Sequence, residues 1–219
     1  MSRWSDPQTV AGFSRSPPNA TLLRFVEDET GGRSRSAVLD LGCGAGRNAV
    51  PIAALGCRVL GTDNEWRMIE AAARRARTEG MAERTHWALA AMDRLPAADR
   101  AFDVIVAHGI WNLARSGAEF RRAVAAAARA GRPGAGLFVF TFSRDTLPPD
   151  AQPIAGEAFV FTHFAGEPQC FLTEGQLLAE MAAAGFEGLG PLTGHNRPRP
   201  GQLNRGGPVI WEGTFRLRS

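Results

Sequence analysis

A short apolar run that breaks into a glycine cluster constrains this chain more than any other stretch. Residues 37–46 read A-V-L-D-L-G-C-G-A-G, and a helical pattern follows over residues 47–55. This order predicts a buried strand, a tight glycine turn and the start of a helix. Glycine suits such a turn because it adopts backbone angles that other residues avoid and lets a ligand approach closely. The N–H groups at the start of the helix then face that ligand.

A carboxylate stands where a nucleotide site needs one. A second strand-like run, residues 58–62, ends at Asp63, roughly 20 residues after Gly42. At that spacing a second-strand acid meets a ribose diol in a βαβ unit. The glycine pattern is G-x-G-x-G, with Arg47 in the place of the third dinucleotide glycine, and Asp40 precedes the first glycine. Both details disfavour a nicotinamide cofactor.

The residues around these two strands resemble one family. V-L-D-L-G-C-G-A-G-R-N followed by V-L-G-T-D resembles the first two motifs of the class I S-adenosylmethionine (SAM)-dependent methyltransferases, over residues 36–186. The variant G-C-G-x-G-R-N is similar in style to the tellurite-resistance and thiopurine methyltransferase-like branches. The resemblance implies an enzyme of the EC 2.1.1 type that uses SAM and releases S-adenosyl-L-homocysteine (SAH).

Strand and helix patterns alternate along most of the chain. Strands are predicted over residues 38–41, 58–62, 85–89, 102–107, 136–142, 186–192 and 208–217, and helices over 7–15, 18–28, 47–55, 65–79, 119–130 and 173–184. Such alternation predicts an α/β fold, a doubly wound Rossmann-like, mostly parallel sheet with helices on both faces. The resemblance adds an antiparallel C-terminal edge hairpin. Residues 131–134, G-R-P-G, are expected to form a turn before the fifth strand.

The domain organisation is expected to be a single SAM-binding domain over residues 1–219 with two additions. Residues 1–36 form an N-terminal helical cover, in which Trp4 and Phe13 either line the substrate side or only pack the cover onto the core. Residues 143–170 are too long for an ordinary connection. They begin at the carboxyl end of a central strand, where ligands of α/β sheets bind, and are interpreted as a substrate cover.

Composition narrows the class of protein. Hydrophobic residues make up 44% and charged residues 21%, which is typical of a globular domain, and no apolar run approaches the length of a membrane span. No signal core begins the chain, and the three cysteines suit neither a zinc site nor a disulfide framework, so we expect a cytoplasmic protein without a metal. The net charge of +3 is too mild to demand a nucleic-acid partner, and the oligomeric state stays open.

The resemblance also implies which residues hold the cofactor. Asp40 is expected to bind the methionine ammonium, directly or through water, and Asp63 to accept two hydrogen bonds from the ribose; as an alternative, Asp63 caps the following helix. Either Asp93 or the backbone of Ala91 and Met92 is expected to bind adenine. Cys43 is expected to be structural. The full predicted set is Asp40, Gly42, Cys43, Gly44, Gly46, Asn48, Asp63, Asn64, Met92, Asp93 and His108.

Catalysis and acceptor binding are less constrained. His108 follows the fourth strand and is interpreted as a cofactor contact, as a general base, or as a plain strand cap. His163 in the cover is a second candidate base. The predicted substrate-binding residues are Trp111, Phe142, Arg144 and Phe164.

The function we expect is methylation of a small molecule, because a long cover loop is present and no added nucleic-acid domain is seen. One alternative is an RNA or protein methyltransferase, based on the basic tail residues Arg197, Arg199, Arg205, Arg216 and Arg218. The other is a non-catalytic SAM- or nucleotide-binding subunit, because the motifs speak for binding alone.

Overall fold

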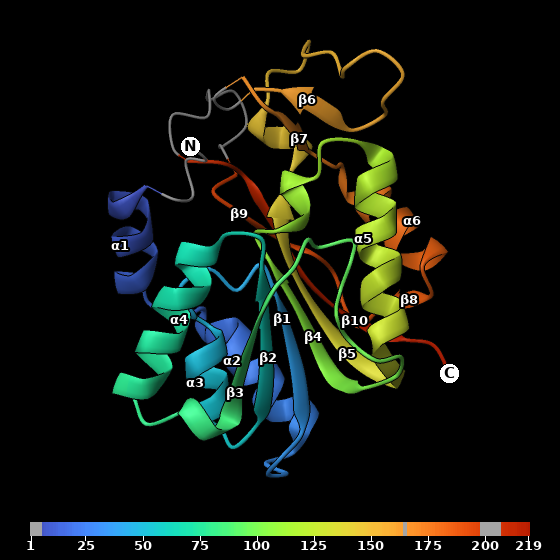
Figure 1. The fold of residues 1–219 in the computed structure, drawn as a ribbon. Helices are drawn as coiled ribbons and strands as arrows, with labels where there is room; N and C mark the ends of the chain where they lie inside the picture. The colour runs from blue at the N-terminus through green and yellow to red at the C-terminus, as the bar shows by residue number, and fades with distance from the viewer. Residues whose placement is uncertain (1–5, 164–165, 198–206) are drawn as a thin grey trace.

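The computed structural model describes residues 6–163, 166–197 and 207–219, without the side chains of residues 7, 11, 13 and 14 (Figure 1). The helices are α1 (Pro7–Arg15), α2 (Ala20–Thr30), α3 (Ala49–Ala54), α4 (Trp66–Thr78), α5 (Gly117–Ala130) and α6 (Glu174–Ala183). The strands are β1 (Ala37–Leu41), β2 (Arg58–Asp63), β3 (Thr85–Leu89), β4 (Phe102–His108), β5 (Gly131–Phe142), β6 (Val160–Thr162), β7 (Pro168–Cys170), β8 (Phe186–Gly188), β9 (Thr193–His195) and β10 (Ile210–Leu217).

One sheet carries the fold. Among the described residues it has eight strands in the order β3-β2-β1-β4-β5-β10-β8, with β9 paired to β10. Strands β1 to β5 run parallel, and β10 runs antiparallel to β5, β8 and β9. The predicted doubly wound sheet with an antiparallel C-terminal edge is therefore confirmed. The strand order reverses between β1 and β4, which is where open α/β sheets bind ligands.

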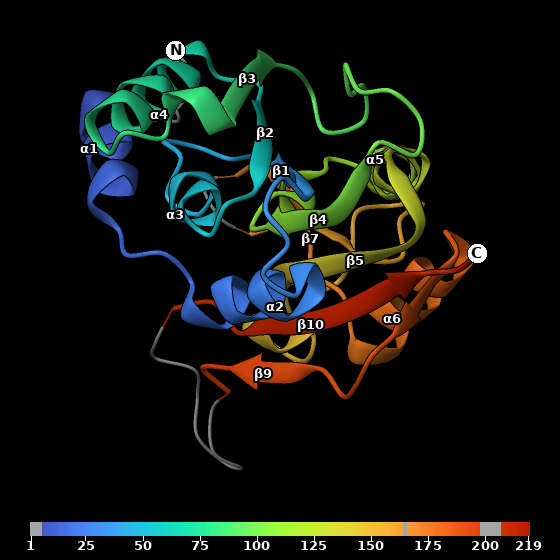
Figure 2. The same cartoon turned by 90° about the horizontal axis from the view of Figure 1, so that it is seen from below.

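Helices cover both faces of the sheet, as predicted. Helices α2 and α3 pack on one face, and α5 and α6 on the other (Figures 1 and 2). Strand β4 shows how the sequence allows this. Val104 and Val106 join the α2 face, whereas Ile105 and Ala107 join the α5 face. A strand covered on both sides needs apolar side chains in both directions, which explains its nearly continuous apolar run.

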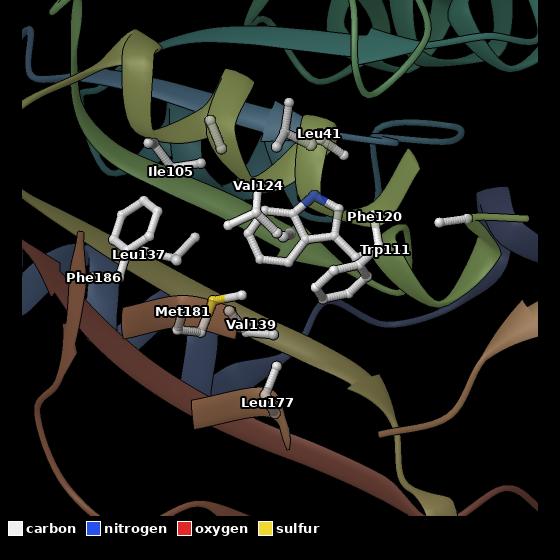
Figure 3. Close-up of a cluster of buried hydrophobic side chains, with 14 of the residues drawn as sticks. Leu41, Ile105, Trp111, Phe120, Val124, Leu137, Val139, Leu177, Met181 and Phe186 are labelled. Atoms are coloured by element: carbon white, nitrogen blue, oxygen red, sulfur yellow. The ribbon is translucent and has the colours of Figure 1, made fainter. Parts of the chain in front are cut away.

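The core on the α5 face is the larger one. Figure 3 shows Trp111 and Phe120 packed among side chains from β4, β5, α5 and α6. Trp111, Phe120, Ile105, Leu137 and Leu177 are fully buried. This core holds the carboxyl ends of β4 and β5 in fixed positions, and the loops that follow them build the site described below.

Local capping signals set the helix boundaries. Asn19 caps α2, its Oδ1 accepting the Leu22 N–H, and Thr173 caps α6 in a full capping box with Gln176. In both caps a side-chain oxygen before the helix satisfies an N–H that has no partner within the helix.

Most element boundaries shift from the prediction by one or two residues, and three differences are larger. The turn predicted over residues 131–134 lies inside β5, because Gly131 already pairs with Phe102 and the chain bulges between Phe102 and Val104. The strand predicted over 186–192 shortens to β8. Strand β9 lies partly in a segment expected to be loop, where it is held only by pairing to β10, which local periodicity does not reveal.

The 143–170 insertion is folded and not an open loop. Strands β6 and β7 form an antiparallel hairpin, and Leu147, Phe161 and Phe171 bury a small core of their own beneath it. Strand β7 packs against the 3-10 turn Trp111–Leu113, and Cys170 Sγ lies 3.4 Å from the carbonyl oxygen of Ala114. The insertion is thus attached to the loop that leaves β4.

In the described part of the chain, no helix combines the length and apolarity that crossing a membrane requires.

Candidate functional site

A pocket opens at the carboxyl ends of β1 and β4, at the reversal of strand order. Its empty volume, part of which is open to solvent, is about 660 Å³. It is lined by residues of the glycine loop, the end of β2 and the loop after β4: Asp40, Gly42, Cys43, Gly44, Ala45, Arg47, Asn48, Asp63, Asn64, Met68, His108, Gly109, Ile110 and Leu113. The structure therefore brings together eight of the eleven residues predicted to bind the cofactor, and Gly46, Met92 and Asp93 are not among the lining residues in the described structure.

The glycine loop forms the floor of the pocket. Gly42 has φ of +62°, and a Cβ there would lie 2.6 Å from Cδ1 of Ile110, so both its conformation and its surroundings require glycine. Cys43 is buried between the glycines, and burial raises the pKa of its thiol well above the ordinary value. A thiol that stays protonated is a poor nucleophile, in line with the structural role expected for Cys43.

Asp63 joins the end of β2 to the glycine loop. Its Oδ2 accepts the Gly44 N–H and its Oδ1 accepts the Glu65 N–H, both at 2.9 Å. Helix α4 is capped at Glu65 and not at Asp63, so the alternative of Asp63 as its N-cap is wrong. Each carboxylate oxygen keeps a second lone pair, so acceptor capacity remains for a ribose.

Asp40 has a buried carboxyl group, and one of its two oxygens lacks a hydrogen-bond partner among the described residues. Its side chain is 2% exposed, and Oδ2 has no hydrogen-bond partner among the described residues. The pKa of Asp40 is raised to about 7, because burial outweighs the opposing effect of Arg47 and nearby Asp63 adds to the rise. An unpaired buried acceptor is rare, because it costs free energy unless a ligand satisfies it. The residues present therefore fit a ligand with an ammonium group.

His108 lies at the edge of the pocket, between two donors. Its Nδ1 is 3.1 Å from Nη2 of Arg47, its Nε2 is 3.3 Å from Nδ2 of Asn19, and its ring stacks on Phe140 at 4.2 Å. Burial, with Arg47 beside it, lowers the pKa of His108 to about 4. The ring is therefore neutral near pH 7, which suits a hydrogen-bonding contact better than a store of positive charge.

Three site features were missed from the sequence. Arg47 lines the pocket, and its position inside the glycine motif was a signal, although it was used only to disfavour a nicotinamide cofactor. Asn19 reaches the site because its N–H donates to Oδ1 of Asn48. Glu212 on β10 accepts from Nδ2 of Asn19 at 2.9 Å, and no local pattern indicated this.

The residues predicted for adenine do not line the pocket in the described part of the chain. Oδ2 of Asp93 accepts from Nε of Arg122 on α5 at 3.1 Å, which occupies that carboxylate with an ion pair. These contacts argue against adenine binding by Asp93. The other alternative, adenine binding by the backbone of Ala91 and Met92, stays a prediction.

The predicted acceptor residues lie elsewhere. Trp111 is fully buried in the core on the α5 face, so its predicted contact with substrate is wrong. Arg144 donates to the carbonyl oxygens of Leu147, Pro148, Pro149 and Ala151 and stacks on Phe161, so its guanidinium stabilises the insertion. These contacts argue against its predicted role in anion binding.

Three further candidates lie in or before the insertion. Phe142 packs beside Phe171 under the β6–β7 hairpin, and His163 is exposed with its ring 6.2 Å from that of Phe171. Phe164, like Trp4, lies outside the described residues. Neither Phe142 nor His163 lines the pocket in the part of the chain that the structure covers.

The family model that matches this chain and the curated relative described below are both methyltransferases. Residues 38–134 match the family model of the methyltransferase domain. The chain is 33% identical over 153 residues to a ubiquinone biosynthesis O-methyltransferase of Methylocella silvestris. That match covers 67% of this chain but 56% of the relative, so the chain spans little more than half the length of this curated relative.

Solved structures show the same fold. A SAM-dependent methyltransferase of Methanosarcina mazei superposes with a TM-score of 0.70 at 20% identity, over 85% of this chain and 94% of that one. A 1,6-didemethyltoxoflavin N1-methyltransferase of Burkholderia thailandensis, solved with its substrate and SAH, gives 0.68 at 20% identity over 98% and 82%. With the glycine loop, Asp40 and Asp63 in place, residues 38–134 form a methyltransferase domain, and the chain has the fold of the class I SAM-dependent methyltransferases, whose cofactor is SAM.

Proposed function

We propose that this chain transfers a methyl group from SAM to a small-molecule acceptor. The observation that carries the proposal is the buried carboxylate of Asp40, whose Oδ2 has no partner within the described residues and which lines the pocket at the strand reversal. The methionine end of SAM carries an ammonium group that would satisfy this oxygen. Asp63, at the end of the next strand, β2, supplies the acceptor oxygens for the ribose.

The chain's own residues have a positioning task. Bound SAM supplies a methyl group on a sulfonium that is already a good leaving group. The pocket walls must hold the acceptor in line with that methyl group and exclude water, and such positioning supplies much of the acceleration. A base is required only where the acceptor loses a proton. Because its pKa lies near 4, His108 is a weak base at neutral pH, and we assign it a contact role.

The insertion supports a small acceptor. Strand β7 packs on the turn Trp111–Leu113, and Ile110 and Leu113 from that same loop line the pocket. Residues 143–170 therefore brace the wall of the pocket beside β4. A braced, mostly apolar wall suits a compact acceptor that enters the pocket. The ubiquinone-pathway relative and the toxoflavin-bound neighbour act on small molecules by their names.

The contacts of the basic tail do not favour a nucleic acid. Arg216 is bound to Glu29 on α2, and Arg197 stacks on Trp211 near Asp145. Both side chains are thus engaged within the protein. Arg199 and Arg205 lie outside the described residues.

Calorimetric titration with SAH tests the proposal. The wild-type protein should bind SAH, and Asp40→Asn should weaken that binding by at least tenfold, since a hydrogen bond to a charged group contributes about 1.5–3 kcal/mol. Asp99→Ala, which removes an exposed carboxylate paired with Arg129, serves as the matched control and should bind as the wild type does. A panel of phenol, amine and thiol acceptors would follow, with methylated product measured by mass spectrometry.

Failure has two distinct forms. Absence of SAH binding by the wild-type protein would remove the cofactor assignment. Tight SAH binding without methylation of any acceptor in the panel would instead favour the non-catalytic binding subunit. RNA methylation with strong salt dependence would replace the small acceptor by a nucleic acid.

A further inference from the structure

A row of three polar side chains from distant parts of the chain, one buried and two partly buried, lies beside the pocket. His108 ends β4, Asn19 precedes α2, and Glu212 lies on β10. The sheet register places His108 and Glu212 on either side of Phe140, at one level of the sheet. Glu212 is only 7% exposed, which is unusual for a carboxylate without an arginine or lysine partner. We call Asn19, His108 and Glu212 the polar row.

Asn19 fixes the direction of the hydrogen bonds in the row. Its Oδ1 accepts the Leu22 N–H at 3.0 Å, so the amide cannot turn without losing the cap of α2. Its Nδ2 therefore faces the other two members, at 2.9 Å from Oε2 of Glu212 and 3.3 Å from Nε2 of His108. The other Glu212 oxygen, Oε1, lies 3.4 Å from Nε2 of His195 on β9. That nitrogen makes no hydrogen bond among the described residues, so the bond from Asn19 is the contact that holds Glu212.

Together, Arg47 and Asn19 direct one hydrogen-bond donor more at the His108 ring than the ring can accept. Arg47 donates and cannot accept, and its Nη2 faces Nδ1 of His108, while Asn19 faces Nε2 with an N–H group. A neutral imidazole accepts at one ring nitrogen only. One of the two donors, from Arg47 or from Asn19, must therefore find another acceptor. An oxygen of a ligand carboxylate at this corner would supply it.

Charge at this corner matches the amino-acid end of a ligand. Arg47 interacts with Asp40 on one side and His108 on the other, so a cation and an unsatisfied carboxylate are neighbours in the pocket wall. A zwitterion presents an ammonium and a carboxylate a short distance apart. Asp40 suits the former and Arg47 the latter.

We propose that Glu212 is a positioning residue for the amino-acid end of the cofactor: acting through Asn19 and His108, it holds the guanidinium of Arg47 toward the ligand carboxylate. This inference rests on the proposed function, because it takes SAM or SAH as the ligand. Glu212 itself does not line the pocket in the described structure. Its effect on the ligand is transmitted by Asn19, which Glu212 orients, and by the His108 ring, which accepts a hydrogen bond from Asn19 or from Arg47 but not from both.

The test compares two ligands in calorimetric titrations of the full chain. SAH carries the amino-acid end, and 5′-methylthioadenosine has the same adenosine and thioether without it. The wild-type protein should bind SAH at least about tenfold more tightly. Glu212→Leu removes the acceptor at similar volume and should weaken SAH binding by roughly tenfold, while 5′-methylthioadenosine changes by less than about twofold. Equal losses for both ligands, or no loss for SAH, would overturn the inference.

Two further variants keep the test sharp if Glu212→Leu folds poorly. Asn19→Ser retains a cap for α2 but removes the amide donor, so it should weaken SAH binding selectively. Glu212→Gln keeps an acceptor oxygen and should bind SAH within about threefold of the wild type. If Asn19→Ser does not weaken SAH binding selectively, transmission through Asn19 is contradicted.

Non-additivity identifies the path through Arg47. Arg47→Met should abolish the preference for SAH, and adding Glu212→Leu to it should cause no further loss, because the two substitutions remove one shared interaction. Additive losses would show that Glu212 acts independently of Arg47. Glu29→Leu is the matched control, since Glu29 is a carboxylate bound to the far end of β10 through Arg216. It should leave both affinities unchanged.

The two proposals fail differently. Wild-type protein that binds neither ligand would remove the proposed function. Wild-type protein that binds both ligands equally would keep an adenosine-type site but remove the role assigned to Arg47 and Glu212.

Discussion

Oδ2 of Asp63 accepts the backbone N–H of Gly44 at 2.9 Å, which ties the end of β2 to the glycine loop after β1. The same carboxylate accepts the Glu65 N–H through its other oxygen. One side chain therefore holds the loop in shape and presents acceptors to the pocket. Ligand binding and loop geometry are coupled at this residue.

Asp63→Ala should reduce SAH affinity by roughly 100-fold or more. The substitution removes two acceptors for the ribose, each worth about 1.5–3 kcal/mol when charged, and releases the Gly44 N–H. Calorimetric titration measures the loss. Asp150→Ala, which removes an exposed carboxylate in the insertion, is the comparison. An Asp63→Ala variant with wild-type affinity would contradict the ribose assignment.

Asp40→Asn should stabilise the unliganded protein above pH 7. The pKa of Asp40 is raised from an unfolded value near 3.9 to about 7 in the folded chain. Between these values the folded state binds the extra proton, so the free energy of unfolding falls as pH rises from about 4 to about 7. Asparagine does not titrate, so the variant lacks this loss. Its free energy of unfolding should exceed that of the wild type by on the order of 2–4 kcal/mol at pH 8, and this difference should shrink toward zero near pH 4.

Urea unfolding of the wild-type and Asp40→Asn proteins at about pH 4 and about pH 8, the lower end of this range and above its upper end, would measure this difference. The same variant is expected to bind SAH more weakly, so stability and binding should move in opposite directions. A variant less stable than the wild type at both pH values would contradict the raised pKa of Asp40.

His108→Phe should remove a loss of stability at acidic pH. The pKa of His108 falls from an unfolded value near 6.5 to about 4 because of burial and the neighbouring Arg47. Between these values the unfolded state binds the extra proton, so wild-type stability falls as pH drops from about 6.5 to about 4. Phenylalanine keeps the stacking on Phe140 without titrating.

The measurement is the urea midpoint of both proteins at pH 5 and pH 7.5. The wild type should lose more stability than His108→Phe between the two. Equal changes in both proteins would mean that another group controls this pH range.

Gly42→Ala should destabilise the fold by roughly 2–4 kcal/mol and narrow the pocket. A side chain at φ of +62° costs about 1–2 kcal/mol, and the added Cβ would meet Ile110 at 2.6 Å, which adds the penalty of overpacking. Gly156→Ala is the matched control, because Gly156 has φ of +83° with no atom within 4 Å of the added carbon. It should show the backbone penalty alone. Thermal unfolding measures the loss of stability of each variant, and SAH titration measures the effect of a narrowed pocket. Equal losses of stability in Gly42→Ala and Gly156→Ala would argue against the contact with Ile110.

The sequence predicted the parts of the site that depend on local pattern. The run from Val38 to Gly46 and the acid at Asp63 lie on consecutive elements of one βαβ unit, so their spacing along the chain sets their distance in space. The cap of α6 at Thr173 was equally local, because it involves residues three apart. Arg47 was visible in the same motif but was not recognised as a site residue.

Residues far apart in the chain required the tertiary structure. Asn19 and Glu212 are separated by 193 residues, yet they share a hydrogen bond, because the sheet order places β10 two strands from β4 and α2 crosses that face. Side-chain direction was the second unknown. Trp111 follows a strand that is covered on both faces, and only the packing against α5 decides that its ring enters the core and not the pocket.

The sequence by itself therefore determined the fold class, the glycine loop and the acid of the second strand, because short-range spacing and periodicity encode them. The tertiary structure alone decided which long-range side chains reach the pocket, that Arg144 is taken up by carbonyl groups, and that the insertion carries its own core. These outcomes depend on sheet register and on competition for hydrogen-bond partners among elements that are distant in sequence, which no local pattern records.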